Sequence, residues 1–171
     1  MLSRNKRLTV FYVLYLMIVL TSAPVYVFAA DKTLLMANGR FVRDFNTGLI
    51  WSRCSVGQKW NGSYCDGNVM MMTYKVALKV AQSAYEDGKD TGRRWRIPTQ
   101  RELMSIVCKD CGSGIFIDKS LFPNTSKVAY WTQSHNIFRW RFRWSINFAN
   151  GNKYGNNPDE AELALRLVSD N

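Results

Sequence analysis

The amino terminus of the chain has the pattern of a secretory signal. Arg4, Lys6 and Arg7 form a basic head, and an apolar run follows over residues 8 to about 20. Residues 27–29 end this segment with small side chains at the two positions that a signal peptidase inspects. We therefore predict a signal peptide over residues 1–29 and an exported protein that is periplasmic, at the cell surface or secreted. The alternative is an uncleaved membrane anchor, because residues 8–28 approach the roughly 20 residues of a spanning helix.

Export bears directly on the four cysteines, all of which follow this segment: Cys54, Cys65, Cys108 and Cys111. An even number of cysteines in an exported chain predicts two disulfides. The count leaves the connectivity open; we expect a Cys54–Cys65 bridge, which would contribute roughly 3 kcal/mol, and a Cys108–Cys111 bridge. A Cys-x-x-Cys pair also occurs in redox enzymes, at the amino terminus of a helix. Here the pair follows a predicted helix, at the end that disfavours a thiolate, so we predict no redox role.

The net charge limits the partners. Removing residues 1–29 takes away three of the 23 basic residues and none of the 13 acidic ones, so the formal net charge falls from +10 to +7. A basic exported protein meets little nucleic acid, so sulfated or carboxylated polysaccharides, anionic lipid headgroups and acidic proteins are the candidate partners. Residues 30–171 contain no linker, long charge block or repeat, and we treat them as a single domain.

The polarity pattern predicts an α+β fold. Alternation around the turn at residues 46–48 predicts a β-hairpin over 40–52, and apolar residues at helical spacing predict a helix over 73–85 with Thr73 as N-cap. Thr99 and Glu102 have the spacing of a capping box for a second helix that runs to about Val107. Residues 112–127 are predicted to be an ordered loop, and further strands are expected near residues 128–132, 140–148, 153–154 and 163–168. This order favours two helices packed on a small, mostly antiparallel sheet.

Several segments match, in chain order, one family of exported bacterial proteins. They are Phe41-Val42-Arg43-Asp44, Thr47-Gly48-Leu49-Ile50-Trp51, Trp95-Arg96-Ile97-Pro98-Thr99 with Glu102-Leu103, Ile117-Asp118, Phe122-Pro123-Asn124-Thr125, Tyr130-Trp131-Thr132, Phe148-Ala149-Asn150-Gly151 and Leu165-Arg166-Leu167-Val168. Over residues 40 to 168 the chain thus resembles the Lcl C-terminal domain family.

The resemblance implies a C-type-lectin-like fold, which formylglycine-generating enzymes share and whose Arg-Ile-Pro-Thr block is similar to residues 96–99. The named member of the family is a trimeric adhesin domain that binds sulfated glycosaminoglycans, which implies adhesion and a homo-oligomer for this chain by analogy. The cysteine pair of the formylglycine-generating enzymes lies late in the chain, at a position that this sequence does not fill, so no enzymatic kinship is implied.

Residues 138–144 alternate between aromatic and basic side chains. On a regular strand this places Arg139, Arg141 and Arg143 on one face, roughly 6.6–6.8 Å apart, as a comb suited to a repeating polyanion. Lys153 lies nearby in the predicted sheet. The alternative is an edge strand whose arginines keep it soluble and block edge pairing.

The chain contains six tryptophans, and aromatic faces pack against sugar rings, so tryptophans are candidates for carbohydrate binding. The family blocks place Trp51, Trp95 and Trp131 in the core, which leaves Trp60 as a candidate exposed platform, with Trp140 or Trp144 as further candidates. Three arginines precede the second helix and are candidates to extend the basic patch: Arg93, Arg94 and Arg96. Arg96 belongs to a family block, so a structural role is an equal alternative.

The sequence contains no recognisable catalytic or metal site. His135 is the only histidine, and no cluster of histidine, cysteine and carboxylate has ligand spacing. Residues 157–162 resemble half of a calcium-lectin pattern whose second half is absent, so a solvated acidic turn is favoured over a cation site. No phosphate loop or nucleophile elbow occurs. We predict neither an enzyme nor a cofactor.

Together these features predict an exported module that binds a polyanionic, sulfated glycan in adhesion or recognition. The predicted ligand-binding residues are Arg139, Arg141, Arg143, Lys153 and Trp60. The alternative is a structural or assembly component of an envelope machine, such as a pilus or secretion apparatus, in which the same face docks an acidic protein. Binding that weakens with salt would favour the glycan.

Overall fold

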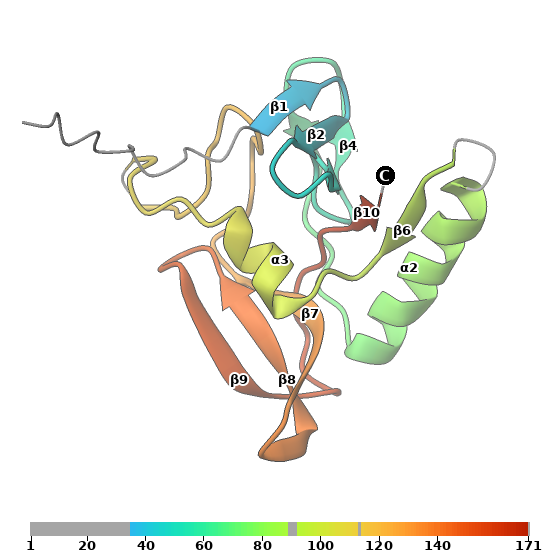
Figure 1. Ribbon diagram of the computed structural model, residues 1–171, viewed down its shortest axis with the longest axis vertical. Helices are drawn as coiled ribbons and strands as arrows, with labels where there is room; N and C mark the ends of the chain where they lie inside the picture. The colour runs from blue at the N-terminus through green and yellow to red at the C-terminus, as the bar shows by residue number, and fades with distance from the viewer. Residues whose placement is uncertain (1–34, 89–91, 113, 171) are drawn as a thin grey trace, which may run out of the picture. The chain divides into compact units, whose positions relative to one another are not determined.

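The computed structural model describes residues 35–88, 92–112 and 114–170 (Figure 1). The signal peptide predicted over residues 1–29 lies outside these residues. Thr33–Asn171 form one compact unit. Among the described residues, no helix has the length and the apolar character needed to cross a membrane.

The strands of the described residues form three antiparallel sheets. The largest has the order β1-β2-β3-β10-β6. Its strands are β1 (Leu35–Asn38), β2 (Phe41–Asp44), β3 (Ile50–Ser52), β10 (Val168–Asp170) and β6 (Arg94–Arg96). A two-stranded sheet pairs β4 (Lys59–Trp60) with β5 (Cys65–Asp66), and a three-stranded sheet consists of β7 (Ala129–Asn136), β8 (Arg139–Asn147) and β9 (Asn152–Pro158). With the two helices described below, this confirms the α+β class with small, mostly antiparallel sheets.

The predicted hairpin is β2–β3. The Asp44 carboxylate accepts hydrogen bonds from the backbone N–H of Asn46 at 2.9 Å and of Thr47 at 3.3 Å, and Gly48 takes the positive φ that closes the turn. Val42 pairs with Trp51, and both side chains are fully buried. The neighbouring pair, Phe41 with Ser52, therefore lies on the opposite face of the sheet from these two side chains.

The two helices begin where the sequence predicts. Helix α2 (Tyr74–Gly88) buries a stripe of small residues, Ala77 and Ala81, while the predicted Val76 is 41% exposed. It ends three residues later than predicted, at Gly88, where a Cβ would lie 2.3 Å from the Arg93 carbonyl oxygen, so glycine allows β6 to approach the helix. Helix α3 (Gln100–Ser105) begins at a complete capping box, and the side chain of Thr99 accepts a hydrogen bond from the Glu102 N–H at 3.2 Å.

The strand predicted over residues 163–168 is wrong in extent, because β10 begins only at Val168. Leu163 instead forms an isolated bridge with Met72, and Ala164 forms one with Tyr130. Residues 164–169 are all buried, so this segment passes between sheets and pairs with different neighbours in turn. Strands β4, β5 and β6 were not predicted, since two or three residues are too short for alternation to be recognised.

The core consists of two clusters of buried side chains. One surrounds Tyr130 and Phe148 and includes Ile115, Ile117 and Phe122 from the predicted loop, which confirms that this loop is ordered and anchored. The other surrounds Trp131 and contains the small residues of α2 together with Leu165. Both clusters pack against the three-stranded sheet, because Tyr130 and Trp131 are successive residues of β7 and point to opposite faces.

Candidate functional site

Arg143 does not lie on an exposed face with Arg139 and Arg141, so the predicted comb of three arginines is wrong. Arg139 and Arg141 are exposed, but Arg143 is only 9% exposed. Its Nε donates to Oδ1 of Asp159 at 2.6 Å, and its guanidinium lies 3.5 Å from the ring centre of Tyr74. Register shifts in the pairing of β8 with both neighbours interrupt the alternation, and the ion pair with Asp159 draws Arg143 inward.

Lys153 is exposed but lies away from the two exposed arginines. It pairs with Ile146, which is seven residues along β8 from Arg139. Seven residues of strand span roughly 23 Å. The Nζ atom of Lys153 instead lies 5.4 Å from the ring centre of Trp144. The structure therefore separates Lys153 from the end of β8 at which Arg139 and Arg141 lie.

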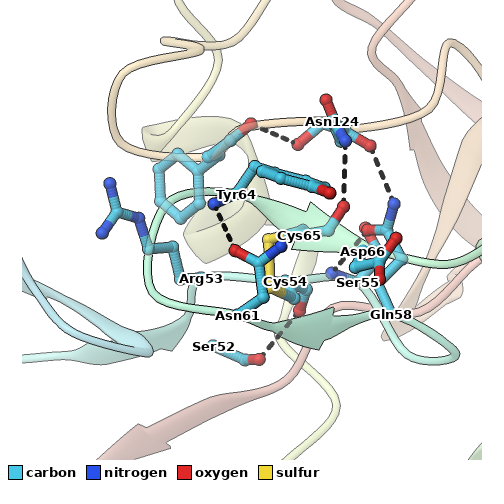
Figure 2. The surroundings of a disulfide bond; sticks show 12 residues. Ser52, Arg53, Cys54, Ser55, Gln58, Asn61, Tyr64, Cys65, Asp66 and Asn124 are labelled. Atoms are coloured by element: carbon cyan, nitrogen blue, oxygen red, sulfur yellow. Dashed lines mark hydrogen bonds between the residues drawn. A yellow bond between two sulfur atoms is a disulfide. The ribbon is translucent and has the colours of Figure 1, made fainter.

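Trp60 lies on a small hairpin that the Cys54–Cys65 disulfide holds to β3. The predicted disulfide is present, and Trp60 is the cross-strand partner of Cys65. Figure 2 shows the hydrogen bonds around this disulfide. The Asn61 side chain accepts from the N–H of Tyr64 at 3.0 Å to close the hairpin turn, and the Asn124 side chain donates to the Cys65 carbonyl oxygen at 2.9 Å. These contacts give Trp60 a defined position.

Arg53 supports Trp60 from one side. Its guanidinium lies 4.0 Å from the Trp60 ring centre and donates to three backbone carbonyl oxygens. Those acceptors are Gly39 at 3.1 Å, Ser120 at 2.8 Å and Leu121 at 3.0 Å. Since Arg53 is held by its own hydrogen bonds, it fixes the ring of Trp60, which is half-buried.

A cleft of about 420 Å³ lies beside Trp60, and we call it the Trp60 cleft. Its lining residues come from the first hairpin and from the disulfide-bonded segment: Arg40, Phe41, Ser52, Cys54, Gln58, Lys59 and Trp60. Gln58 is held in place because its side-chain nitrogen donates to the Asn124 carbonyl oxygen at 3.0 Å (Figure 2). Arg40 and Lys59 are both exposed, and the lining contains no acidic residue. The Trp60 cleft therefore has the charge to receive an anion.

A second cleft of about 450 Å³ shares three of these residues, and we call it the Trp95 cleft. It is lined by Arg40, Phe41, Ser52, Ala84, Asp87, Gly88, Arg93, Trp95 and Leu167. The Phe41 ring stacks on Trp95 with ring centres 5.5 Å apart, and the Arg93 guanidinium lies 4.3 Å from the Phe41 ring centre. Because the two clefts share Phe41 with Arg40 and Ser52, we refer to them together as the Phe41 groove. Each is within the size range of small-ligand sites.

Arg166 binds the chain segment that contributes Ser52 and Cys54 to the groove. It is fully buried, and its guanidinium donates to the carbonyl oxygens of Ser52 and Arg53 and to the hydroxyls of Ser55 at 3.2 Å and Thr125 at 2.7 Å. Burial lowers the pKa of this guanidinium, and no carboxylate among the described residues forms an ion pair with it. Arg166 thus fixes the segment that includes Ser52 and Cys54, although its own side chain does not reach the surface.

Arg96 has a structural role. It donates to both Glu102 carboxylate oxygens at 2.8 Å and to Asp170. The hydrogen bond from Arg96 lowers the pKa of Asp170. Burial acts to raise the pKa of Glu102, but the hydrogen bonds and charge of Arg96, together with the Thr99 N–H, lower it overall. Arg96 therefore joins β6, α3 and β10 and is engaged within the fold.

The second cysteine pair forms the predicted Cys108–Cys111 disulfide, after the end of α3. The acidic segment considered for calcium contributes Asp159 to the ion pair with Arg143. Within the described part of the chain, no group of three histidine, cysteine or carboxylate side chains lies close enough to hold a metal ion.

Sequence reasoning identified Trp60 and considered Arg93, but it missed Arg40, Phe41 and Lys59 as a group. Phe41 was recognised only as part of a family block. The available signal was the hairpin register, which makes Phe41 and Ser52 cross-strand partners on the face opposite Trp51. The convergence of Lys59 and Arg93 on that face depends on tertiary structure.

The family model of the Lcl C-terminal domain matches residues 40–169. This range contains every residue that lines the Phe41 groove. Comparison with curated proteins and with solved structures gave no match.

Proposed function

Because the chain belongs to the Lcl C-terminal domain family, we propose that it is an exported, non-enzymatic binding module for a polyanionic glycan. The observation that supports this function best is the Phe41 groove, whose two clefts share Arg40, Phe41 and Ser52 and are lined by aromatic rings and cations. Recognition of an anionic sugar needs an apolar face for the ring and charged donors for sulfate or carboxylate. The groove offers both, and we infer that it is the binding surface.

The charges of the two clefts suggest how the glycan is oriented. Arg40 and Lys59 would bind a sulfate or carboxylate in the Trp60 cleft, where no acidic side chain opposes it. The Trp95 cleft combines Arg93 with Asp87, and a carboxylate is an acceptor for sugar hydroxyls. We therefore expect the anionic group beside Trp60 and a less charged part of the glycan beside Trp95.

Export and a C-type-lectin-like fold are parts of the same proposal. Export is supported by the signal pattern of residues 1–29 and by two disulfides, which persist in oxidising compartments. The fold is supported by two helices with small antiparallel sheets and by β10, which brings the end of the chain into one sheet with β1, β2 and β3. A homo-oligomer, by analogy with the trimeric adhesin domain, would place several grooves on one assembly.

The test is binding of residues 30–171 to immobilised heparin and to a neutral polysaccharide at low and high salt. We expect selective binding to heparin that weakens with salt. The double variant R40S/K59S removes both cations of the Trp60 cleft. Charge-assisted hydrogen bonds contribute about 1.5–3 kcal/mol each, so its affinity should fall by at least about tenfold.

Two further variants serve as comparisons. K75S/K79S removes the same charge from the exposed face of α2 and should change affinity by no more than about twofold. R139S/R141S tests the exposed arginines of β8; a larger loss here than in R40S/K59S would move the site to β8, as the sequence predicts. Absence of heparin binding by the unmodified domain at low salt would refute the glycan proposal and direct the search to an envelope protein.

A further inference from the structure

The turn between β7 and β8 presents large apolar side chains to solvent. Ile137 is 85% exposed, Phe138 90% and Trp140 74%, whereas the other exposed large apolar side chains of the described residues reach at most 49%. This turn projects past the end of the three-stranded sheet (Figure 1). Neighbouring exposed apolar side chains often mark a site that binds a protein or a membrane, whereas single exposed apolar side chains are common and need no explanation. We refer to residues 136–141 as the hairpin tip.

The residues of the turn are not those that turn formation favours. Asn136 pairs with Arg139, so the loop consists of Ile137 and Phe138 alone. Two-residue hairpin loops favour asparagine, aspartate and glycine, which tolerate positive φ. Neither Ile137 nor Phe138 has a positive φ, and neither is buried. Local turn preference and core packing therefore both fail to explain this choice, which is typical of a functional position.

Hydrogen bonds hold the hairpin tip in place. The Asn136 side chain accepts from the Phe138 N–H at 3.0 Å and donates to the Gly155 carbonyl oxygen of β9 at 2.6 Å. Next to Asn136 on β7, Nδ1 of His135 lies 3.2 Å from the carbonyl oxygen of Trp140 on β8. The backbone of the turn that carries the apolar side chains is therefore held by hydrogen bonds to both neighbouring strands.

The charged residues of the hairpin tip itself are both basic. Arg139 and Arg141 are exposed and flank Trp140, with the Arg141 guanidinium 5.2 Å from its ring centre. Residues 119–158 include six basic residues and no acidic residue. Arg139 and Arg141 would therefore attract an anionic partner surface, and the acidic residue that follows this range, Asp159, is paired with Arg143.

We propose that the hairpin tip inserts into the interface of a lipid bilayer that contains anionic phospholipids. Ile137 and Phe138 enter the boundary of the acyl chains, Trp140 lies at the level of the headgroups, and Arg139 and Arg141 contact phosphates. A protein partner would need a pocket shaped for this convex tip, whereas a fluid interface accepts it without one. This contact uses no residue of the Phe41 groove, so it stands or falls separately from glycan binding.

The experiment measures co-sedimentation of residues 30–171, after mass spectrometry has verified the loss of residues 1–29, with two kinds of vesicle. One kind contains equal parts of phosphatidylcholine and phosphatidylglycerol, and the other contains phosphatidylcholine alone. We expect binding to the anionic vesicles, a loss of at least about tenfold in partitioning for F138S/W140S, and a weaker salt dependence for R139Q/R141Q. The matched control V76S/L78S removes two apolar side chains that are 41% and 49% exposed on α2, and it should bind as the unmodified domain does.

A second readout locates the contact. Lipids with brominated acyl chains should quench part of the tryptophan fluorescence, and W140F should remove that quenching while binding persists. The proposal is overturned if the unmodified domain does not sediment with anionic vesicles. It is also overturned if F138S/W140S and V76S/L78S lose vesicle binding equally. A third contrary result would be that F138S/W140S loses binding to a protein partner but keeps its binding to anionic vesicles.

Discussion

The Cys54–Cys65 disulfide should contribute more to stability than the Cys108–Cys111 disulfide, because it closes a longer loop. The paired cysteines are separated by 11 residues in the first case and by 3 in the second. On the chain-entropy relation these separations correspond to about 2.8 and about 1.6 kcal/mol. Cys65 is fully buried whereas Cys111 is exposed, so the loss of buried contacts in C54A/C65A acts in the same direction.

Calorimetry of residues 30–171 near neutral pH without reductant measures the difference. For a unit of this size, the unfolding entropy converts the two values to reductions in Tm of about 10 °C for C54A/C65A and about 5 °C for C108A/C111A. C54A/C65A should also weaken heparin binding, since the disulfide fixes the hairpin that positions Lys59 and Trp60, and C108A/C111A should not. Equal or reversed Tm changes would refute the loop-length reasoning.

Two further changes test the buried and half-buried arginines. Substitution of Arg96 by Met should reduce the stability of the fold most near neutral pH. Arg96 interacts with the ionised carboxylates of Glu102 and Asp170, and in the folded state the pKa values of both groups lie below their ordinary values. The stabilisation by Arg96 is therefore complete above about pH 4.5 and disappears as the pH falls through the folded-state values, so the Tm gap between R96M and the unmodified domain should close in acid. The second change is R166K, which should lower the free energy of unfolding measured by urea denaturation by about 3 kcal/mol. One ammonium group cannot replace the four hydrogen bonds of this buried guanidinium. A cost below about 1 kcal/mol would show that the charge alone, and not the planar fork, is what the core requires.

Features whose partners lie close together in the chain were predictable. The capping box joins Thr99 to Glu102, and the β2–β3 turn is closed by Asp44 and Gly48 within five residues. Both disulfides join cysteines that are near neighbours in sequence, and the pairing expected for them is present. In each case the chain between the partners is too short to offer many alternatives.

The predicted binding surface depended on an assumption that tertiary structure did not meet. Strict alternation on β8 assumes a regular strand with one face free. The bulges of β8 and the carboxylate of Asp159, 16 residues further along the chain, remove Arg143 from that face. Such a partner is selected by packing and not by local pattern.

By itself, the sequence predicted the two helices, the β2–β3 hairpin, the presence of two disulfides and the family, because each is specified by a few residues in fixed spacing. Only the tertiary structure decided which cations share a surface. Arg40, Lys59 and Arg93 come from three separate segments. They line one groove because the fold brings the residue preceding β2, the disulfide-bonded hairpin and the residue preceding β6 close to Phe41. A charge at the surface interacts with whatever the fold places beside it, and distance along the chain does not determine that neighbour.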